Sequence, residues 1–413
     1  MPQMNPSTRI LHLIHHDDRG GAPVAMVHQL RYLAAPAPGG GGQPRCLNMA
    51  VFGRGGGAGQ GPGRIEAFCR QHNVPFATPW LGSKLLLPAA LLHTWWIIRR
   101  WRPDMVLLYG QWGAPVGALA ARMAGVRRCV YNAQWPAYYQ DFSPLKAAAN
   151  NLAEAVPAAL CRRVIALSPG NFHQYFIRGW DEPATAGGAP RLVQLPNCTD
   201  TAAPSPESVA QWRAQWGWRP DTVQVVSLGR LVPQKRMDWL MRAWALWQSQ
   251  PHGRQGAAAD GKDAAPAAHL WIVGGGDVQR FRALARELGI ASTCTLTGFE
   301  SDGWKRLAAA DIFALTSRSE GLPFVVIEAM AAGVPVLASR VDGIEGTVRE
   351  GIDGLLAPAT DLHAFAHALD RLVRDADLRR RLGQGGRERS KDFDCATVLP
   401  RYEALYNEVL AEQ

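Results

Sequence analysis

The stretch that decides the fold is SRSEGLPFVVIEAMAAGVP, residues 317–335. It predicts a polar loop, a helix and the start of a strand. Pro323 suits a helix start, where its missing N–H matters least, and Gly333 suits a helix end. Glu320 then lies in the loop at the carboxyl end of a strand, and Glu328 lies inside the helix, more than one turn from its start. Two carboxylates that bracket a helix start at the edge of a parallel sheet favour a ligand site.

The residues around these carboxylates indicate what the ligand carries. Gly321 lets the backbone approach closely, and the unpaired N–H groups and positive dipole end of a helix start favour phosphate. Glu320 and Glu328 would face different parts of one ligand. A second loop, GRLVPQKR, contributes Arg230 and Lys235, which can hold a diphosphate from two sides. We therefore expect a ligand with both hydroxyls and a diphosphate.

Apolar runs alternate with helical patterns along both halves of the 413 residues, which predicts an α/β chain with parallel sheets. Hydrophobic residues make up 47% and charged residues 19%, which excludes disorder. We expect Rossmann-like domains at residues 1–200 and 201–395, and a helix within 396–413 that packs back on the first domain. The predicted strands are residues 9–14, 46–52, 105–109, 129–132 and 164–167, then 223–228, 270–273, 295–296, 312–315 and 334–338.

Three segments rich in Gly, Ala and Pro, residues 35–44, 53–63 and 251–268, are predicted to be surface insertions without chemistry. The second contains GRGGGA, which matches the G-x-G-x-x-A pattern of dinucleotide sites. More glycines and a proline follow where the phosphate-binding helix should begin, so we expect no dinucleotide there.

The charge and cysteine content narrow the class of protein further. A net charge of +9 suits a phosphate-bearing ligand or an anionic membrane face, and no basic run or nucleic-acid motif accompanies it. Seven scattered cysteines without a C-x-x-C pair predict reduced, structural thiols. No apolar run reaches the roughly 18 to 20 residues of a spanning helix, and no signal peptide is recognisable. These features predict a cytoplasmic protein whose basic charge allows peripheral attachment to the inner membrane face.

Together these residues resemble the retaining nucleotide-sugar glycosyltransferases of the GT-B fold, specifically glycosyltransferase family 4 (group 1). The family's E-x7-E motif corresponds to Glu320 and Glu328, and its G-R-L-x-x-x-K motif to Gly229, Arg230, Leu231 and Lys235. The resemblance covers almost the whole chain. It implies two Rossmann-like domains facing a central cleft, and hexosyl transfer with retention from a nucleotide-diphosphate sugar to an oligosaccharide or lipid-linked acceptor. It also implies a place in surface polysaccharide biosynthesis, without a metal or cofactor.

The resemblance assigns a role to each motif residue. Arg230 and Lys235 would neutralise the diphosphate, including the charge on the leaving group. Glu320 would hold the transferred sugar together with the backbone after it, and Glu328 would hold ribose hydroxyls. The other donor positions that the resemblance implies are Gly20, Gly21, Gly229, Gly298, Phe299, Gly321, Leu322, Pro323 and Phe324.

The acceptor side departs from the family pattern. Many members carry a histidine where Gln134 stands, with Asn132 and Trp135 beside it. Glutamine cannot act as a general base. The resemblance implies that no enzymatic base is needed, because the departing phosphate takes the acceptor proton. A catalytically inactive partner that binds a nucleotide sugar is the alternative on the same fold. A nucleotide-sugar epimerase would need acid–base residues, and a phosphorylase would need a pyridoxal-binding lysine. The sequence shows no motif for either.

Metal ligands are poorly supported by the sequence. Asp392 and Asp394 spell D-x-D, but they stand far from any predicted strand end. His15 and His16 end the first strand and would point apart on extended backbone, so His15 can face the site without forming a metal pair.

Residues 85–101, LLLPAALLHTWWIIRRW, leave two structures open. They can form a helix packed on the sheet, or an interfacial helix that serves a lipid-linked acceptor.

Overall fold

The computed structural model describes residues 4–17, 20–36, 42–53, 62–79, 87–111, 113–134, 144–181, 190–250 and 267–412. The chain divides into two compact units. The N-terminal unit contains residues 1–198 and 395–413, and the C-terminal unit contains residues 199–394. The chain therefore passes between the units twice, after Cys198 and after Asp394.

A parallel sheet forms the centre of the N-terminal unit, with strand order β3-β2-β1-β4-β5-β6-β7. Strands β4 and β5 are buried along their whole length, as expected for a sheet with helices on both faces. The short edge strand β3 was not predicted, because two residues carry no periodicity. The strands are β1 (Arg9–Ile14), β2 (Leu47–Phe52), β3 (Phe76–Ala77), β4 (Met105–Tyr109), β5 (Cys129–Ala133), β6 (Arg163–Ala166) and β7 (Leu192–Gln194).

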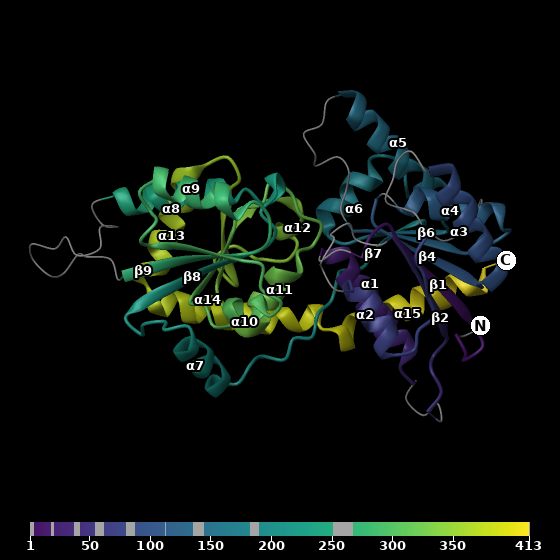
Figure 1. Cartoon of the computed structure of the whole chain (residues 1–413), viewed down its shortest axis with the longest axis horizontal. Coiled ribbons are helices and arrows are strands. Elements are labelled where there is room, and N and C mark those ends of the chain that lie inside the picture. Colours follow the sequence, from purple (N-terminus) through teal and green to yellow (C-terminus); the bar gives the residue numbers. More distant parts are fainter. Residues whose placement is uncertain are drawn as a thin grey trace, which may run out of the picture. The chain divides into compact units, whose positions relative to one another are not determined.

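Helices cover both faces of this sheet (Figure 1). Helices α3 to α6 lie on one face, where their side chains join the core of β1, β4 and β5. Helices α1, α2 and α15 lie on the other face. Their bounds are α1 (Gly21–Ala34), α2 (Arg64–Gln71), α3 (Leu87–Trp101), α4 (Gly113–Met123), α5 (Pro144–Leu160), α6 (Pro169–Phe176) and α15 (Cys395–Ala411).

The final helix, α15, is held in the N-terminal unit by a buried polar chain. The hydroxyls of Tyr406 and Tyr109 both donate to Gln29 Oε1, at 2.5 and 2.6 Å. The Tyr109 hydroxyl also lies 3.0 Å from Nδ1 of His12, whose Nε2 lies 3.0 Å from Asn48 Oδ1. Burial lowers the pKa of His12 to about 4, so the imidazole is neutral and can both donate and accept.

The C-terminal unit has a second parallel sheet, with strand order β10-β9-β8-β11-β12-β13. Both units therefore contain the Rossmann-like arrangement that the alternating pattern predicted. Strand β9 begins three residues earlier than predicted and takes in the end of the expected insertion, because Ala267 and Ala268 pair with β8. The strands are β8 (Thr222–Leu228), β9 (Ala267–Val273), β10 (Cys294–Gly298), β11 (Ile312–Leu315), β12 (Val336–Arg340) and β13 (Gly354–Pro358).

Helices again lie on both faces of the second sheet (Figure 1). Helices α8, α9 and α13 build one core layer, and α10, α11 and α7 contribute to the other. The bounds are α7 (Pro206–Gln215), α8 (Met237–Ser249), α9 (Val278–Glu287), α10 (Gly303–Ala308), α11 (Phe324–Ala332), α12 (Asp342–Glu345), α13 (Leu362–Arg374) and α14 (Ala376–Ser390), with short 3-10 turns η3 (Pro233–Lys235) and η4 (Lys391–Phe393).

Each sheet has one point where the strand order reverses direction. It lies between β1 and β4 in the first sheet and between β8 and β11 in the second. Ligands of open α/β sheets bind outside the carboxyl ends of the strands at such points. No helix in the described part of the chain is long and apolar enough to cross a bilayer.

Candidate functional site

The loop after β11 holds the first predicted carboxylate in a buried position. Glu320 is 5% exposed. A Cβ at Gly343, in α12, would lie 2.3 Å from the Glu320 carbonyl oxygen and 2.5 Å from that of Gly321. Only glycine allows α12 to pack this closely against the loop. Gly343 is therefore a supporting residue that sequence reasoning missed, since no local pattern marks it.

Lys235 and Glu320 form a direct ion pair. Lys235 Nζ lies 2.6 Å from Glu320 Oε1, and the two side chains are 15% and 7% exposed. The sequence predicted both residues at one site but assigned them to different parts of the ligand. The structure brings them into contact because the loops after β8 and β11 meet at the point where the sheet reverses.

Four further hydrogen bonds fasten these two loops together, two of them from one shared hydroxyl proton. The backbone N–H of Arg318 donates to the carbonyl of Gln234 at 2.8 Å, and the Gln234 side-chain amide donates to the Ser319 carbonyl at 2.7 Å. The buried Thr316 hydroxyl donates to the carbonyls of Lys235 and Arg236 at 3.1 and 3.0 Å. Gln234 and Thr316 thus position the Lys235 loop, a role that the sequence analysis did not assign.

A glycine turn packs against the start of the same loop. Gly274 has a φ of 157°, and a Cβ there would lie 1.8 Å from the Gly229 carbonyl oxygen. Gly276 similarly approaches Leu231, whose N–H donates to Gly275 at 2.8 Å. Asp277 caps the helix that follows this turn, since its side chain accepts from the Arg280 N–H at 3.0 Å. The turn fixes the course of the chain from Gly229 to Leu231.

Two of the predicted donor residues, Gly298 and Phe299, stand at the end of β10. Gly298 ends the strand with a φ of 83°, a left-handed conformation that favours glycine. Phe299 is 49% exposed, and its Cβ lies 3.4 Å from the position that a Cβ on Gly275 would take. An exposed aromatic ring at the carboxyl edge of the sheet can stack on a planar base.

Helix α11 begins at Phe324, with Pro323 as its N-cap. Proline has no side-chain oxygen, so it cannot cap the first backbone N–H groups as Ser or Asp would. This leaves the helix start suited to an anion. Glu328 is the fifth residue of the helix and half-buried, and Gly333 ends the helix with a φ of 75°, as predicted.

The predicted residues of the N-terminal unit stand at the carboxyl end of β1. Gly20 is the N-cap of α1, and Gly21 is the first residue of that helix. The expectation that His15 and His16 point apart is wrong, because their ring centroids lie 3.6 Å apart. The strand ends at Ile14 and the chain bends there, so strand alternation no longer applies. Burial and the neighbouring His16 lower the pKa of His15 to about 4.

A cluster of amides, which includes Gln134, stands at the end of β5. Gln134 Nε2 donates to Asn132 Oδ1 at 2.8 Å and to Asn197 Oδ1 at 3.1 Å, while Asn197 Nδ2 donates back to Gln134 Oε1 at 3.2 Å. All three side chains are buried. Trp135, predicted beside them, lies outside the described residues. Asn197 was not predicted, since it is distant in sequence from Gln134.

The predicted D-x-D motif has structural partners. Asp392 accepts from Arg389 at 2.6 Å, and Asp394 bonds the Thr201 hydroxyl. Within the described ranges, no group of three or more His, Cys, Asp or Glu side chains is arranged to hold a metal ion.

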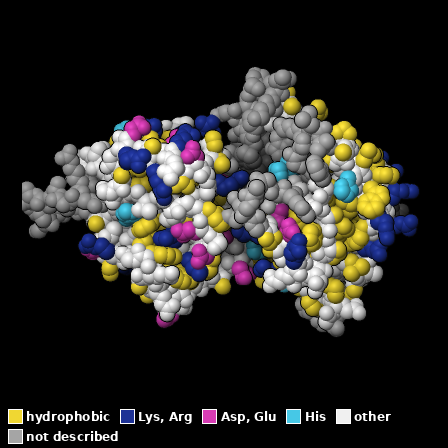
Figure 2. Space-filling view, in the orientation of Figure 1, with side chains coloured by type: hydrophobic (Ala, Val, Ile, Leu, Met, Phe, Trp, Pro, Cys, Tyr) yellow, Lys and Arg dark blue, Asp and Glu magenta, His cyan; other side chains and the backbone are white. Residues whose placement is uncertain are grey.

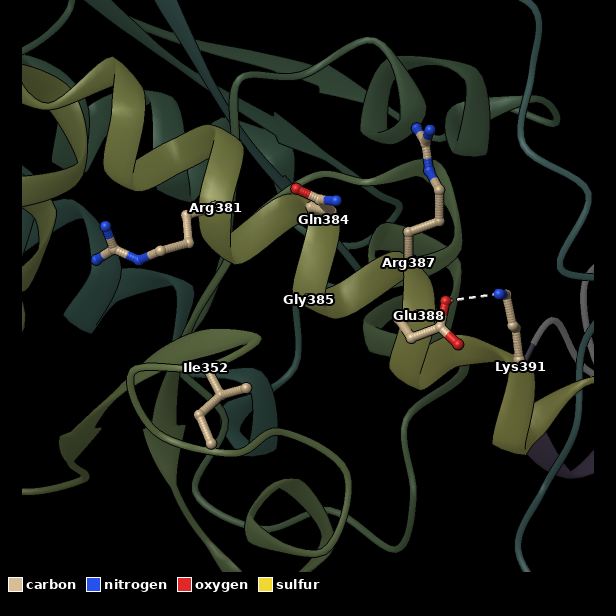
Figure 3. Close-up of a pocket in the computed structure, with 7 residues that line it drawn as sticks. All are labelled: Ile352, Arg381, Gln384, Gly385, Arg387, Glu388 and Lys391. Atoms are coloured by element: carbon tan, nitrogen blue, oxygen red, sulfur yellow. Dashed lines mark hydrogen bonds and ion pairs between the residues drawn. The ribbon is translucent and has the colours of Figure 1, made fainter.

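A cavity of about 680 Å³ lies elsewhere in the C-terminal unit, along α14 (Figure 3). Its charged side chains do not converge, because Arg381 and Arg387 point in different directions and Glu388 pairs with Lys391. None of the predicted site residues lines it. The residues lining it are Ile352, Arg381, Gln384, Gly385, Arg387, Glu388 and Lys391.

Comparison with known proteins finds a family match within the second unit. Residues 208–389 match the family described as "Glycosyl transferases group 1". One relative is the lipopolysaccharide core biosynthesis glycosyltransferase LpsE of Rhizobium meliloti, 32% identical over 181 residues, which cover 44% of this chain and 48% of LpsE. Another is a GDP-mannose-dependent alpha-(1-6)-phosphatidylinositol monomannoside mannosyltransferase of Mycolicibacterium smegmatis, 34% identical over 50% of this chain and 53% of that protein. The chain spans about half the length, or less, of the curated relatives it matches.

Solved structures resemble the whole chain. HepE of Anabaena in complex with UDP and glucose superposes with a TM-score of 0.76 at 20% identity, over 97% of this chain and 100% of HepE. WaaG, a glycosyltransferase involved in lipopolysaccharide biosynthesis, superposes with a TM-score of 0.70 at 16% identity, over 96% and 99% of the two chains. These likenesses confirm the GT-B fold. Residues 208–389 are thus similar to the group 1 glycosyl transferases, and the whole chain has the GT-B fold.

Proposed function

We propose that the protein is a retaining hexosyltransferase of glycosyltransferase family 4, which moves a sugar from a nucleotide-diphosphate sugar to an oligosaccharide or lipid-linked acceptor in surface polysaccharide biosynthesis. The observation that carries the proposal is the buried Lys235–Glu320 pair at the reversal point of the second sheet, with Glu320 in the loop that leads into helix α11. HepE, which shares the fold, has been solved with UDP-glucose and with UDP and glucose.

The charges at this site suit departure of a nucleoside diphosphate. The Lys235 ammonium is already paired with the Glu320 carboxylate. A bound diphosphate would therefore be a second anion in contact with the same ammonium. Arg230, on the same loop as Lys235, would donate two parallel N–H groups of its planar guanidinium to the phosphates. The charge that grows on the departing phosphate is stabilised by these cations and by the start of α11. Glu320 and the backbone from Gly321 to Phe324 hold the sugar, while Glu328 holds the ribose.

We propose that the acceptor-side groups act as neutral hydrogen-bond partners. At neutral pH His15 is uncharged, because its pKa is lowered to about 4. Gln134 and Asn132 are amides and cannot take a proton. The carboxylate of Asp17 accepts from the N–H groups of Ile65 and Glu66, each at 2.8 Å, and so caps α2. The acceptor proton then passes to the leaving phosphate, and no metal or other cofactor takes part.

A surface on the N-terminal unit favours a membrane-associated acceptor. On α3, Leu92 and Trp96 are each 57% exposed, although Ile97 and Ile98 are buried in the core. The helix thus packs on the sheet through one face, and its other face is open to the interfacial role that we propose. Residues 85 and 86 of that stretch lie outside the described ranges.

The neighbouring helix α4 extends this surface. Leu119 and Met123 are exposed on α4, which packs against α3. Figure 2 shows hydrophobic side chains with basic ones beside them where these helices lie. Apolar side chains rimmed by basic ones suit the interface of an anionic leaflet. We propose that the protein binds there peripherally, on the cytoplasmic face. The exposed basic residues on and beside the two helices are Arg99, Arg100, Arg102, Arg122 and Arg127.

A screen of nucleotide sugars tests the donor. UDP-, GDP- and ADP-sugars are compared for thermal stabilisation and for slow hydrolysis, since a ligand that binds only the native state raises its melting temperature. We expect one nucleotide class to stabilise the wild-type protein and to be hydrolysed. Stabilisation without hydrolysis or transfer would instead support the inactive-partner alternative, and no stabilisation by any of them would refute the donor site.

Flotation with vesicles tests the acceptor surface. We expect binding to phosphatidylglycerol vesicles at low salt, and loss of binding when Arg99, Arg100 and Arg102 are all changed to Glu, since each contributes about 1 kcal/mol. The matched control changes Arg286, Arg371 and Arg380, which are exposed on the C-terminal unit, to Glu. Equal loss in both variants would show a general charge effect and contradict a specific surface.

A further inference from the structure

Two cysteines that are distant in sequence meet where the chain passes between the units. The sulfur atoms of Cys198 and Cys395 lie 2.8 Å apart, although 197 positions separate them along the chain. Cys198 is buried and Cys395 is half-buried. Nδ1 of His28, on α1, lies 3.5 Å from the Cys395 sulfur. A dithiol and an imidazole thus form one cluster outside the proposed site.

The backbone holds these two segments side by side. The N–H of Thr199 donates to the carbonyl of Phe393 at 3.0 Å, and Thr199 pairs with Asp394 as an isolated parallel bridge. The Thr201 hydroxyl also bonds Asp394. These backbone contacts therefore keep the two thiols adjacent whether or not a disulfide joins them. The contact between the two cysteines was not predicted, because neither cysteine belongs to a C-x-x-C pattern.

The other five cysteines are all buried. Burial raises the pKa of Cys46, Cys69, Cys129 and Cys294 to about 12, and also raises that of Cys161. A thiol reacts as its thiolate, so these five are poor nucleophiles near neutral pH. They provide internal controls for the reactivity of the pair.

We propose that Cys198 and Cys395 form a peroxide-reactive modification site, which closes to a reversible disulfide. His28 takes the thiol proton of Cys395, whose sulfur attacks a hydroperoxide. The O–O bond breaks, the sulfur becomes a sulfenic acid, and the proton returns to the departing oxygen to give water or an alcohol. The Cys198 sulfur then attacks the sulfenic sulfur, the S–S bond forms, and water leaves with the Cys198 proton. The peroxide is reduced by two electrons, and the two thiols supply them.

The chain leaves the N-terminal unit after Cys198 and returns to it at Cys395, and the disulfide would link these two positions. The closed loop would contain the whole C-terminal unit, and closing a loop of this length restricts the unfolded chain strongly. We expect the oxidised protein to melt at a higher temperature than the reduced protein. This inference does not depend on the proposed transferase activity.

The test treats the full-length reduced protein with hydrogen peroxide and counts thiols after denaturation. We expect the count to fall from seven to five, recovery with dithiothreitol, and a peptide map that links Cys198 to Cys395. In Cys198→Ala, Cys395 should stop at a sulfenic acid that dimedone traps. Cys294→Ser, the matched control, should still form the disulfide, and His28→Gln should form it more slowly.

Three outcomes would overturn the proposal. The first is a peptide map that places the disulfide elsewhere. The second is oxidation of Cys395→Ala as rapid as that of the wild type, measured as loss of the Cys198 thiol. The third is a wild-type pair that peroxide oxidises no faster than Cys294. An unchanged rate in His28→Gln would refute the role of the imidazole.

Discussion

The contact between Lys235 and Glu320 gives the sharpest test of the site. Both side chains are largely withdrawn from water, at 15% and 7% exposed, and the charged atoms lie 2.6 Å apart. Removing one partner of a buried pair typically costs about 3 to 5 kcal/mol, because the other charge is left uncompensated. Lys235→Met leaves the more buried Glu320 alone, and we expect it to lower the free energy of unfolding by about 3 kcal/mol.

The pair energy itself comes from a double-mutant cycle followed by urea unfolding. We expect Lys235→Met and Glu320→Gln together to cost less than the sum of the single changes, with a coupling of about 2 kcal/mol. The control cycle uses Arg219 and Asp221, which lie at the same 2.6 Å separation but are 75% and 63% exposed, and it should be close to additive. An additive result for Lys235 and Glu320 would refute the account of a buried, coupled pair.

The two single variants should respond in opposite ways to a nucleoside diphosphate. Lys235→Met loses a cation, so UDP or GDP should bind it less tightly and stabilise it less. Glu320→Gln releases Lys235 from its carboxylate, so the same nucleotide should bind as tightly as to the wild type or more tightly. Calorimetry with the nucleotide alone measures both. Unchanged affinity in Lys235→Met would remove this lysine from the diphosphate site.

Three further predictions follow from other parts of the chain. Glu328→Ala should weaken nucleotide-sugar binding by about 1.5 to 3 kcal/mol in calorimetry, while Glu287→Ala, on the exposed side of α9, should not; equal affinity for wild type and Glu328→Ala would contradict the ribose contact. EDTA should leave transfer unimpaired, and activity that chelation abolishes and Mg²⁺ restores would contradict a metal-independent site. Because burial lowers the pKa of His12 from 6.5 to about 4, the unfolded chain takes up a proton first as the pH falls. The free energy of unfolding should therefore decrease by on the order of 3 kcal/mol as the pH falls from 6.5 to about 4. His12→Gln should make the melting temperature less dependent on pH over this range.

The sequence predicted the two sheets well because strands in parallel sheets are buried on both faces. Residues 9–14, 105–109 and 312–315 are strands with the predicted bounds. The end of α11 was also predictable, since Gly333 provides the left-handed residue that a helix stop needs. The final helix was predicted within residues 396–413, and α15 spans Cys395–Ala411 with Pro400 inside it.

The contacts within the candidate site were less predictable, because they join residues that are distant in the chain. The motif spacing brought Glu320 and Lys235 to one site but could not show that they touch. Gly343 and Asn197 lack a local signature, and their roles depend on which loops pack together. The rings of His15 and His16 were misplaced because strand geometry was extended two residues past the end of β1 at Ile14.

The most direct test of the central claim is the anomeric configuration of a transfer product. The wild-type protein is incubated with the nucleotide sugar that the screen selects and with a lipid-linked oligosaccharide extracted from bacterial membranes. The product is then examined by proton NMR. A retaining transferase should release one nucleoside diphosphate per sugar transferred. The transferred sugar should have the same anomeric configuration in the product as in the donor. Inversion at the anomeric carbon would contradict the retaining mechanism, and tight donor binding without any product would contradict the transferase itself.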